Sequence, residues 1–270
     1  MPQPFQKSPF GPARNAIGLP FIELQSVDST NNYARSLLYE GLAQHGTTIF
    51  THDQWAGKGQ RGKVWATEKG ANIILSMLVK PEPLQLIQQF ELSVCLSVAL
   101  HEFFMNYAGE NTKIKWPNDL YWQDRKAAGI LVESIVGSQV SGVSINSNVA
   151  QWEWAIVGIG ININQTIFPS GLLNPVSLKQ ITGKSFDVIV LAKEFCVIFN
   201  KYFLELITDG FDNIFSHYLH HLYKKNEIVK LKKGNRAFEA MIKTVSPSGQ
   251  LVVQHGVEEE FNFGEIEWIF

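Results

Sequence analysis

The 270-residue chain is 45% apolar, which is enough to bury a sizeable core in one or two domains. A formal net charge of −2 gives no basic balance of the kind that attracts nucleic acids or anionic membranes. The apolar runs are too short to span a bilayer, and the first 20 residues lack the apolar core of a signal peptide. Cys95 and Cys196 lie in apolar, helix-like runs, so we expect buried free thiols and a reducing cytoplasm.

The first half of the chain predicts alternating helices and strands after a loose, flexible N-terminal arm over residues 1–20. Asp28 or Ser29 can cap a helix that begins near Thr30 and runs to about Leu38. Beyond it the pattern predicts strands at 47–51 and 72–80, a polar, glycine-rich loop at 54–70 and a core helix at 84–107.

The rest of the chain predicts two regions of different type. Short strands are expected at 112–115, 120–123, 127–135 and 152–163, and helices at 187–207 and 211–223. After Lys225 the pattern changes to short alternating strands separated by turn signals, at 227–232, 237–245, 250–254, 258–263 and 265–269. We therefore predict an α+β domain over 21–223 and a small all-β barrel over 224–270.

One polar cluster spans Lys115–Asp119, a Lys-Trp-Pro-Asn-Asp run at an expected strand–turn–strand. Pro117 ends the first strand, which leaves Lys115 at an exposed strand end beside the turn. Lys126 supplies a second cation on the same face. Such cations suit a reaction on a phosphate or a carboxylate, because they stabilise the charge that develops there. An ordinary surface lysine, and a turn-stabilising Asp119, remain open from the residues alone.

A second polar cluster, Gln54–Trp65, holds three glycines, three cations and two tryptophans. Gly57–Gly62 matches a dinucleotide-binding pattern, but no helical pattern opens at Gly62 and no Walker ending follows. What remains is a loop of backbone N–H donors and cations that could close over an anion, or a solvated, charged hairpin.

Three further segments carry weaker signals of the same kind. Ser29–Asn31 begins a helix, where such residues act as caps and could also offer their side chains to a ligand. Gly129–Glu133 and Gly158–Asn162 are strands with internal glycines, which often mark close approach of a ligand or of another backbone. A packing requirement or a bulge would explain those glycines equally well.

Taken together, these motifs resemble the biotin protein ligases, in family order and spacing, from about residue 22 to the C-terminus. The resemblance implies that biotin is bound by Ser29, Thr30, Asn31, Gln54, Gly57, Lys58, Gly59, Gln60, Lys115 and Gly129. It implies a nucleotide side made of Lys63, Trp65, Asn118, Lys126 and Asn162, with Trp65 facing adenine. Lys115 would be the main catalytic cation, assisted by Lys126 and Asp119.

The resemblance also implies a fold and an activity. The fold would be a class II synthetase-like mixed sheet with helices, plus a small SH3-like C-terminal barrel. The activity would be ATP-dependent ligation of biotin to one lysine of the biotin carboxyl carrier domain of a carboxylase, through biotinyl-5′-adenylate. Mg²⁺ would accompany ATP without a metal site of the protein's own, and DNA and membranes are not expected partners. The oligomeric state is left open, a homodimer included.

Two alternatives remain. One is a lipoate–protein ligase of the related family, although the Gln54–Trp65 loop and the Gly129–Glu133 strand favour biotin. The other is a biotin-sensing regulator, because some family members carry an N-terminal DNA-binding domain. Only 28 residues precede Ser29, which is short for a three-helix DNA reader, so we expect the monofunctional enzyme.

One position departs from the family pattern. Gln60 stands where the bifunctional members carry arginine in an otherwise similar glycine-rich loop. Arginine can hold a phosphate with two charge-assisted bonds, whereas glutamine offers a neutral amide. We therefore expect this loop to hold the adenylate through Lys58, Lys63 and backbone N–H groups, unless Gln60 faces solvent and has no role.

Overall fold

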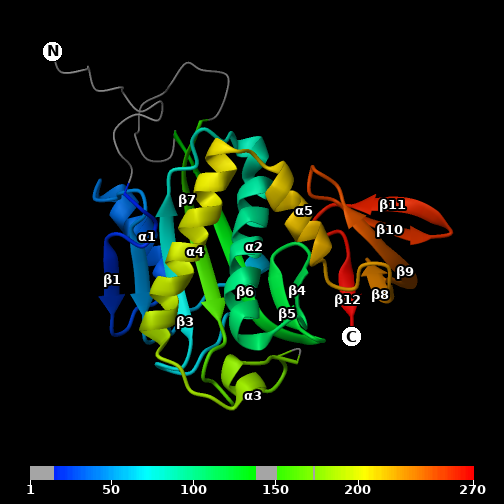
Figure 1. Ribbon diagram of the computed structural model, residues 1–270, viewed down its shortest axis with the longest axis horizontal. Coiled ribbons are helices and arrows are strands. Elements are labelled where there is room, and N and C mark those ends of the chain that lie inside the picture. The colour runs from blue at the N-terminus through cyan, green and yellow to red at the C-terminus, as the bar shows by residue number, and fades with distance from the viewer. Residues whose placement is uncertain (1–14, 138–150, 173) are drawn as a thin grey trace.

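The computed structural model describes residues 15–137, 151–172 and 174–270, and its centre is a seven-stranded mixed sheet (Figure 1). The strand order is β1-β2-β3-β7-β6-β5-β4. The strands are β1 Phe21–Leu24, β2 Thr48–Thr51, β3 Ile73–Val79, β4 Thr112–Lys115, β5 Asp119–Trp122, β6 Arg125–Val136 and β7 Trp152–Ile161. β1 and β2 pair in parallel, and every other neighbouring pair is antiparallel. The predicted α+β class, with a mixed sheet and helices, is confirmed.

Helices cover both faces of this sheet, and β3 shows why. All seven residues of β3 are buried, as expected for a strand covered on both sides. Leu75 and Met77 join the core under helices α2 (Gln89–Ala108) and α4 (Val188–Thr208), which lie in front of the sheet in Figure 1. Because side chains alternate along a strand, Ser76 and Leu78 face the other way, toward α1 (Thr30–Tyr39). Ser76 is therefore the polar residue that β3 presents to α1.

The chain after residue 224 forms a second sheet beside the first (Figure 1). Its strands are β8 Ile228–Lys233, β9 Arg236–Val245, β10 Leu251–His255, β11 Val257–Phe261 and β12 Glu267–Ile269. They run antiparallel in the order β11-β10-β9-β8-β12. All five predicted strands are present. Within this described sheet no pairing joins β11 to β12, so the sheet is open.

Several boundaries differ from the predicted ones for local reasons. Helix α5 (Asp212–His220) ends before the predicted residue 223, because Tyr223 donates its N–H to the Ile114 carbonyl of β4 instead. The short strand β1 and the helix α3 (Leu178–Thr182) were not predicted. The loop at 54–70 contains one 3-10 turn, Gln60–Gly62.

The structure also tests the predicted flexible N-terminal arm and the predicted buried thiols. Residues 1–14 of the predicted flexible arm lie outside the described residues. The end of the arm is held in place, since Ile17 is 3% exposed and its N–H donates to Asn200 Oδ1 of α4. Cys95 and Cys196 are buried and free, as expected. Among the described helices, none is long and apolar enough to cross a membrane.

Candidate functional site

Lys115 and Asp119 form the base of the β4–β5 hairpin, where they face each other in the strand register. The prediction of an exposed Lys115 is wrong, because its side chain points into the protein and the residue is 9% exposed. Burial lowers the pKa of its ammonium to about 8; Asp119 opposes this shift, and Lys126 and Lys63 add to it. The hairpin therefore holds a desolvated cation close to two further lysines.

Asp119 does not pair with Lys115, because Lys126 takes that place. Lys126 Nζ lies 2.6 Å from Asp119 Oδ1. Gly129 stands opposite Asp119 in the strand register, and a Cβ at 129 would lie 3.4 Å from both Asp119 Oδ1 and Lys126 Nζ. The three predicted catalytic residues and Gly129 thus occupy one small region. In the described part of the chain, Lys115 has no hydrogen bond or ion pair.

The two asparagines predicted for the nucleotide side hold backbone in place. Asn118 is buried, and its Nδ2 donates to the Ile130 carbonyl while its own carbonyl accepts the Ile130 N–H. Asn162 Nδ2 donates to the Val176 carbonyl at 3.1 Å. Asn118 therefore ties the β4–β5 turn to β6, and Asn162 ties the end of β7 to the segment at Val176. Sequence reasoning did not anticipate this structural use.

The loop at 54–65 folds back on itself over the sheet. The Trp65 N–H donates to the Gly57 carbonyl at 3.0 Å, and the Gly59 N–H donates to the Lys63 carbonyl at 2.7 Å. A Cβ at Gly57 would lie 2.2 Å from the Trp65 carbonyl oxygen, so only glycine permits this close approach. The loop is a small folded hairpin here, and no helix opens at Gly62.

Trp65 lies flat against β7. A Cβ at Gly160 would be 2.3 Å from Trp65 Cε2, so the missing side chain of this glycine makes room for the indole ring. Lys126 Nζ lies 5.9 Å from the ring centroid. The indole Nε1 is buried and has no hydrogen-bond partner among the described residues. Trp65 therefore brings a donor without an acceptor next to the lysine cluster.

The cations and the amide of the loop point in different directions. Lys58 Nζ lies 2.5 Å from Asn32 Oδ1 of α1, so it turns away from Lys115. Lys63 is exposed. Gln60 is half-buried and its Nε2 donates to the Ile130 carbonyl at 3.3 Å, so the alternative in which it faces solvent is wrong. Gln60 and Asn118 therefore share one acceptor on β6.

A polar network connects the start of α1 to the loop and to β3. The Thr30 N–H and hydroxyl donate to Gln54 Oε1 at 2.9 and 3.3 Å. Ser76 Oγ lies 2.7 Å from Thr30 Oγ1 and 2.5 Å from Asn31 Oδ1. The side chain of Ser29, at the N-cap, makes no capping bond, so the predicted cap by this residue is not formed. Sequence reasoning missed Ser76, whose only signal is a single hydroxyl in an apolar strand.

Glu133 completes this network from β6. Asn31 Nδ2 donates to Glu133 Oε2 at 2.7 Å, and Arg35 Nη2 lies 3.2 Å from Glu133 Oε1. A Cβ at Gly158 would lie 2.4 Å from Asn31 Oδ1. The strand glycines at 158 and 160 thus mark close approach of two side chains, Asn31 and Trp65, which is the packing explanation and not the approach of a ligand or of another backbone. Glu133 orients Asn31 and is held in turn by Arg35.

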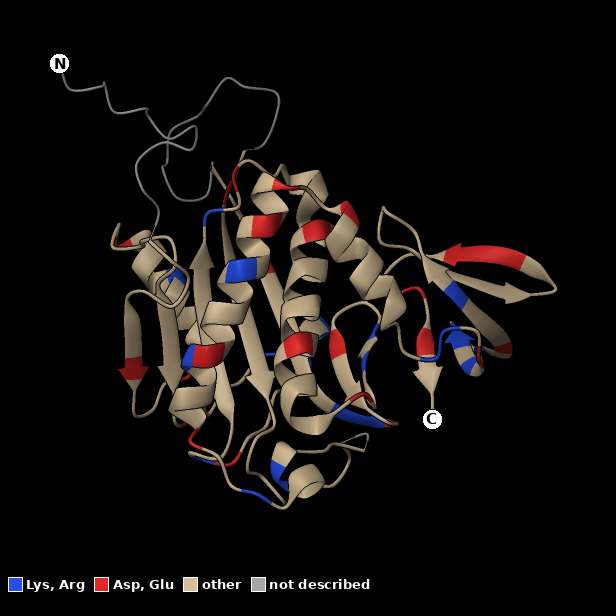
Figure 2. Cartoon of the chain, viewed as in Figure 1, with Lys and Arg blue, Asp and Glu red and all other residues tan. Residues whose placement is uncertain are grey.

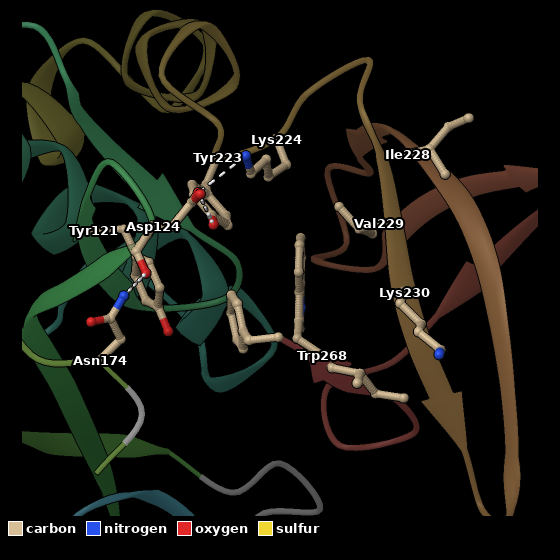
Figure 3. A pocket seen from close by; sticks show the side chains of 11 residues that line it. Tyr121, Asp124, Asn174, Tyr223, Lys224, Ile228, Val229, Lys230 and Trp268 are labelled. Carbon is tan, nitrogen blue, oxygen red and sulfur yellow. Dashed lines mark hydrogen bonds and ion pairs between the residues drawn. The ribbon is translucent and has the colours of Figure 1, made fainter.

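A cavity of about 440 Å³ lies between β5 and the C-terminal sheet (Figure 3). Its lining residues are Tyr121, Asp124, Asn174, Tyr223, Lys224, Ile228, Val229, Lys230, Trp268, Ile269 and Phe270. None of them belongs to the site predicted from the sequence. Tyr223 and Lys224 both contact Asp124 in its wall, at 2.7 and 3.0 Å.

Metal chemistry finds no support in the side chains of the described ranges. They contain no group of three or more His, Cys, Asp or Glu residues placed to hold a metal ion. The arrangement brings together cations, amides, hydroxyls and an aromatic face. Such groups can bind a carboxylate and a phosphate side by side, because charged hydrogen bonds to anions are the strongest of their kind.

Comparison with known proteins identifies relatives. Residues 23–149 match the model of the "Biotin/lipoate A/B protein ligase family". The "Bifunctional ligase/repressor BirA" of Bacillus spizizenii is 32% identical over 209 residues, which are 76% of this chain and 60% of that protein. The "Biotin--[acetyl-CoA-carboxylase] ligase" of Paracoccus denitrificans is 27% identical, over 86% of this chain and 92% of the relative. The chain thus spans about three fifths of the length of the Bacillus protein.

A solved structure shares the fold. It is described as "Biotin protein ligase from Aquifex aeolicus in complex with biotin and ATP", and the match has a TM-score of 0.73 at 24% identity. The match covers 92% of this chain and 97% of the Aquifex chain. This likeness extends over both sheets and supports the same architecture. The Aquifex structure thus shares the architecture of this chain, and residues 23–149 are the part that matches the biotin/lipoate A/B protein ligase family.

Proposed function

We propose that this protein activates biotin with ATP and transfers it to one lysine of a biotin carboxyl carrier domain. The observation that carries the proposal is the buried ammonium of Lys115, which lacks a hydrogen-bonding partner in the described chain and lies beside Lys126. A desolvated cation of this kind suits two anionic reactants that must meet. The Paracoccus relative supports the choice of reactants, because its name is that of a biotin--[acetyl-CoA-carboxylase] ligase.

In the first step, a biotin carboxylate oxygen attacks the α-phosphorus of ATP, the bond to the bridging oxygen breaks, and pyrophosphate leaves. Lys115 reduces the repulsion between the two anions and stabilises the charge that builds up on phosphorus. Lys126 offers a second positive charge, and Lys63 and the Trp65 ring would contact the nucleotide. Magnesium enters with ATP as part of the substrate.

In the second step, the neutral amine of the carrier lysine attacks the carbonyl carbon of the adenylate. AMP leaves with the electron pair of the C–O bond, and an amide forms. The attacking amine loses one proton as the amide forms, and we assign its acceptance to Asp119, the carboxylate beside Lys115 and Lys126. Its pairing with Lys126 at 2.6 Å orients the carboxylate for this task.

On the biotin side, the proposal assigns recognition to the network around α1. The Thr30 and Asn31 side chains, Ser29 beside them, and Gln54 are hydroxyls and amides of the type that bind a neutral urea group. Gly57, Lys58, Gly59 and Gln60 would close over the ligand from the loop. Glu133 would act by orienting Asn31, from which its Oε2 is 2.7 Å away.

The test is transfer of labelled biotin from Mg-ATP and biotin to a purified carrier domain. We expect transfer by the wild type, loss of about 100-fold or more in Lys115→Ala, and no change in Lys184→Ala, which removes an exposed lysine. Lipoate is offered in parallel. Transfer of lipoate instead of biotin would establish the lipoate-ligase alternative, and transfer of neither acid would contradict the family activity.

The proposal includes the wider organisation of the chain. We assign residues 21–223 to a class II synthetase-like catalytic unit and 224–270 to an SH3-like unit, with 1–20 as an arm. The β-bulge between Val252 and Val253 supports curvature of the second sheet toward a barrel. The two free, buried thiols suit the cytoplasm.

Neither DNA nor a membrane is part of the proposal. Basic and acidic side chains are mixed over the strands and helices, and β11 carries three consecutive glutamates (Figure 2). A gel shift at about 200 mM salt tests for sequence-specific DNA binding, because nonspecific phosphate contacts fade there. Sedimentation with and without biotin and ATP would report a homodimer.

A further inference from the structure

The ammonium of Lys115 is surrounded by aromatic rings from two distant parts of the chain. Its Nζ lies 4.8 Å from the ring centroid of Trp268 and 5.7 Å from that of Phe270, both in or next to β12. It lies 5.5 Å from the ring of Tyr121 in β5. All three distances are within the range at which a cation is attracted to an aromatic face.

Asp119 attracts this ammonium, but Asp119 is itself paired with another lysine. The charged groups that act on it are Asp119, Lys126 and Lys63. Asp119 is paired with Lys126 at 2.6 Å, and the two lysines repel Lys115. Lys115 has no ion pair in the described chain, so the three rings are direct attractive contacts of its ammonium, and two of them come from the C-terminal end of the chain.

These rings are fixed by their own packing. Trp268 lies opposite Leu231 in the β12–β8 register, and its ring is 5.7 Å from Tyr223. Phe270 stacks on Tyr121 at 6.0 Å and 14°. The buried Trp268 Nε1 has no hydrogen-bond partner among the described residues. Its N–H therefore adds no hydrogen bond here, and an unmet buried donor is costly, so the contribution of Trp268 lies in its ring.

The rings also border the cavity of about 440 Å³ between β5 and the C-terminal sheet, where Figure 3 shows Trp268 and Tyr121. The same three rings, Tyr121, Trp268 and Phe270, therefore both contact Lys115 and line this cavity. A ring at this place does two things at once. It removes water from the ammonium, which disfavours the charge, and it offers a negative face, which favours the charge.

We propose that Trp268, with Phe270 beside it, is a positioning residue that holds Lys115 charged and aimed at the reacting phosphate. The C-terminal sheet would then contribute directly to adenylate formation through the state of one lysine. This inference rests on the proposed function for its consequence, but the contact between Trp268 and Lys115 is independent of it. An aliphatic side chain at 268 would keep the burial and lose the aromatic face.

The first experiment measures the protonation of Lys115 without any substrate. A lysine-directed acylating reagent is applied across pH 6–11 in the full chain, and labelling of the Lys115 peptide is followed by mass spectrometry. We expect the labelling midpoint in Trp268→Leu to fall by about 0.5–1 pH unit, or about 0.7–1.4 kcal/mol. Trp268→Phe, which keeps an aromatic face, should restore most of the wild-type midpoint.

Phe238→Leu is the matched control. Phe238 is a half-buried aromatic residue of β9 in the same sheet, and its ring packs against His255 and Phe261. The same substitution there perturbs the sheet but not the surroundings of Lys115. An unchanged or raised midpoint in Trp268→Leu, or an equal shift in Phe238→Leu, would overturn the proposal.

The second experiment follows pyrophosphate release from biotin and Mg-ATP as a function of pH. The alkaline limb of the Trp268→Leu profile should move to lower pH by the same amount as the labelling midpoint, and Trp268→Phe should move it back. A labelling shift without a matching rate shift would refute the positioning role. A labelling shift in a protein whose wild type releases no pyrophosphate would leave the contact established and contradict the proposed function.

Discussion

The side-chain oxygen of Asn31 occupies the space that any residue larger than glycine would need at position 158. A Cβ there would lie 2.4 Å from Asn31 Oδ1. Asn31 cannot easily move, because Ser76 and Glu133 hold its amide at 2.5 and 2.7 Å. The glycine in β7 and the asparagine in α1 are therefore one structural unit, which lets the helix approach the sheet where the proposed biotin site begins.

Gly158→Ala should destabilise the protein by about 1–3 kcal/mol, the usual cost of overpacking a core. Urea unfolding measures the change. Gly129→Ala is the matched control on the neighbouring strand, because its Cβ would meet neighbours only at 3.4 Å. Asn31→Ala in the Gly158→Ala background should recover part of the loss. Additive effects of the two substitutions would contradict the direct clash.

Lys115→Met should make the protein more stable and at the same time inactive. The folded protein holds the pKa of Lys115 at about 8, below the usual value of 10.5, so burying the charge costs free energy at pH 7. Methionine removes that cost. We expect a gain of about 1–3 kcal/mol in unfolding free energy at pH 7 from the shift in pKa, together with loss of pyrophosphate release.

The contribution of Lys115 to stability should depend on pH. Between pH 8 and 10.5 the unfolded state binds more protons at Lys115, so stability contributed by this group rises with pH over that window. Lys115→Met should therefore gain most below pH 8 and little above 10.5. Urea unfolding at pH 7 and pH 10 tests this. A loss of stability at pH 7 would show that the ammonium contributes more by its ring contacts than its burial costs.

The sequence predicted the elements whose signal is local. The Lys115–Asp119 hairpin and the five C-terminal strands follow from turn residues and period-2 alternation, and α1 begins at Thr30 as predicted although Ser29 makes no capping bond. The contacts that define the environment of Lys115 do not have such a signal. Trp268 is 153 positions from Lys115 in the chain, and neither segment contains a residue pattern that predicts contact with the other. Ser76 was missed for the same reason, since its partners lie on a helix 45 residues earlier.

His101 and His221 stack at 4.0 Å between α2 and the end of α5, and both have a pKa lowered to about 4. Burial is the main cause in each, and their mutual proximity adds to it for His101. Because the unfolded state protonates near 6.5, stability from these groups is present above that pH and is lost as pH falls toward 4. Acid should therefore weaken the packing between these two helices.

For His101, which is 3% exposed, the free energy of unfolding should fall by about 1–2 kcal/mol between pH 7.5 and pH 5. His101→Gln should reduce this pH dependence in urea unfolding. His220→Gln is the control, because His220 is exposed. An unchanged pH dependence in His101→Gln would exclude the buried histidine as its source.

Gln60 points toward the proposed adenylate site, so an arginine at this position should change how the site holds the adenylate. Its Nε2 donates to the Ile130 carbonyl at 3.3 Å, the same oxygen that Asn118 contacts. An arginine there could keep a contact with the sheet and place a charged, planar group over a bound phosphate. Charge-assisted bonds contribute about 1.5–3 kcal/mol against about 0.5–1.5 for neutral ones.

Gln60→Arg should therefore release labelled biotinyl-adenylate about tenfold more slowly than the wild type in the absence of carrier, for a gain near 1.4 kcal/mol. Gln254→Arg is the control, since it adds the same charge at an exposed position of β10. Release is followed by rapid filtration after the adenylate has formed. If Gln60→Arg releases the adenylate as fast as Gln254→Arg does, then position 60 does not help to retain the intermediate, and retention depends on Lys63, Trp65 and the loop backbone instead.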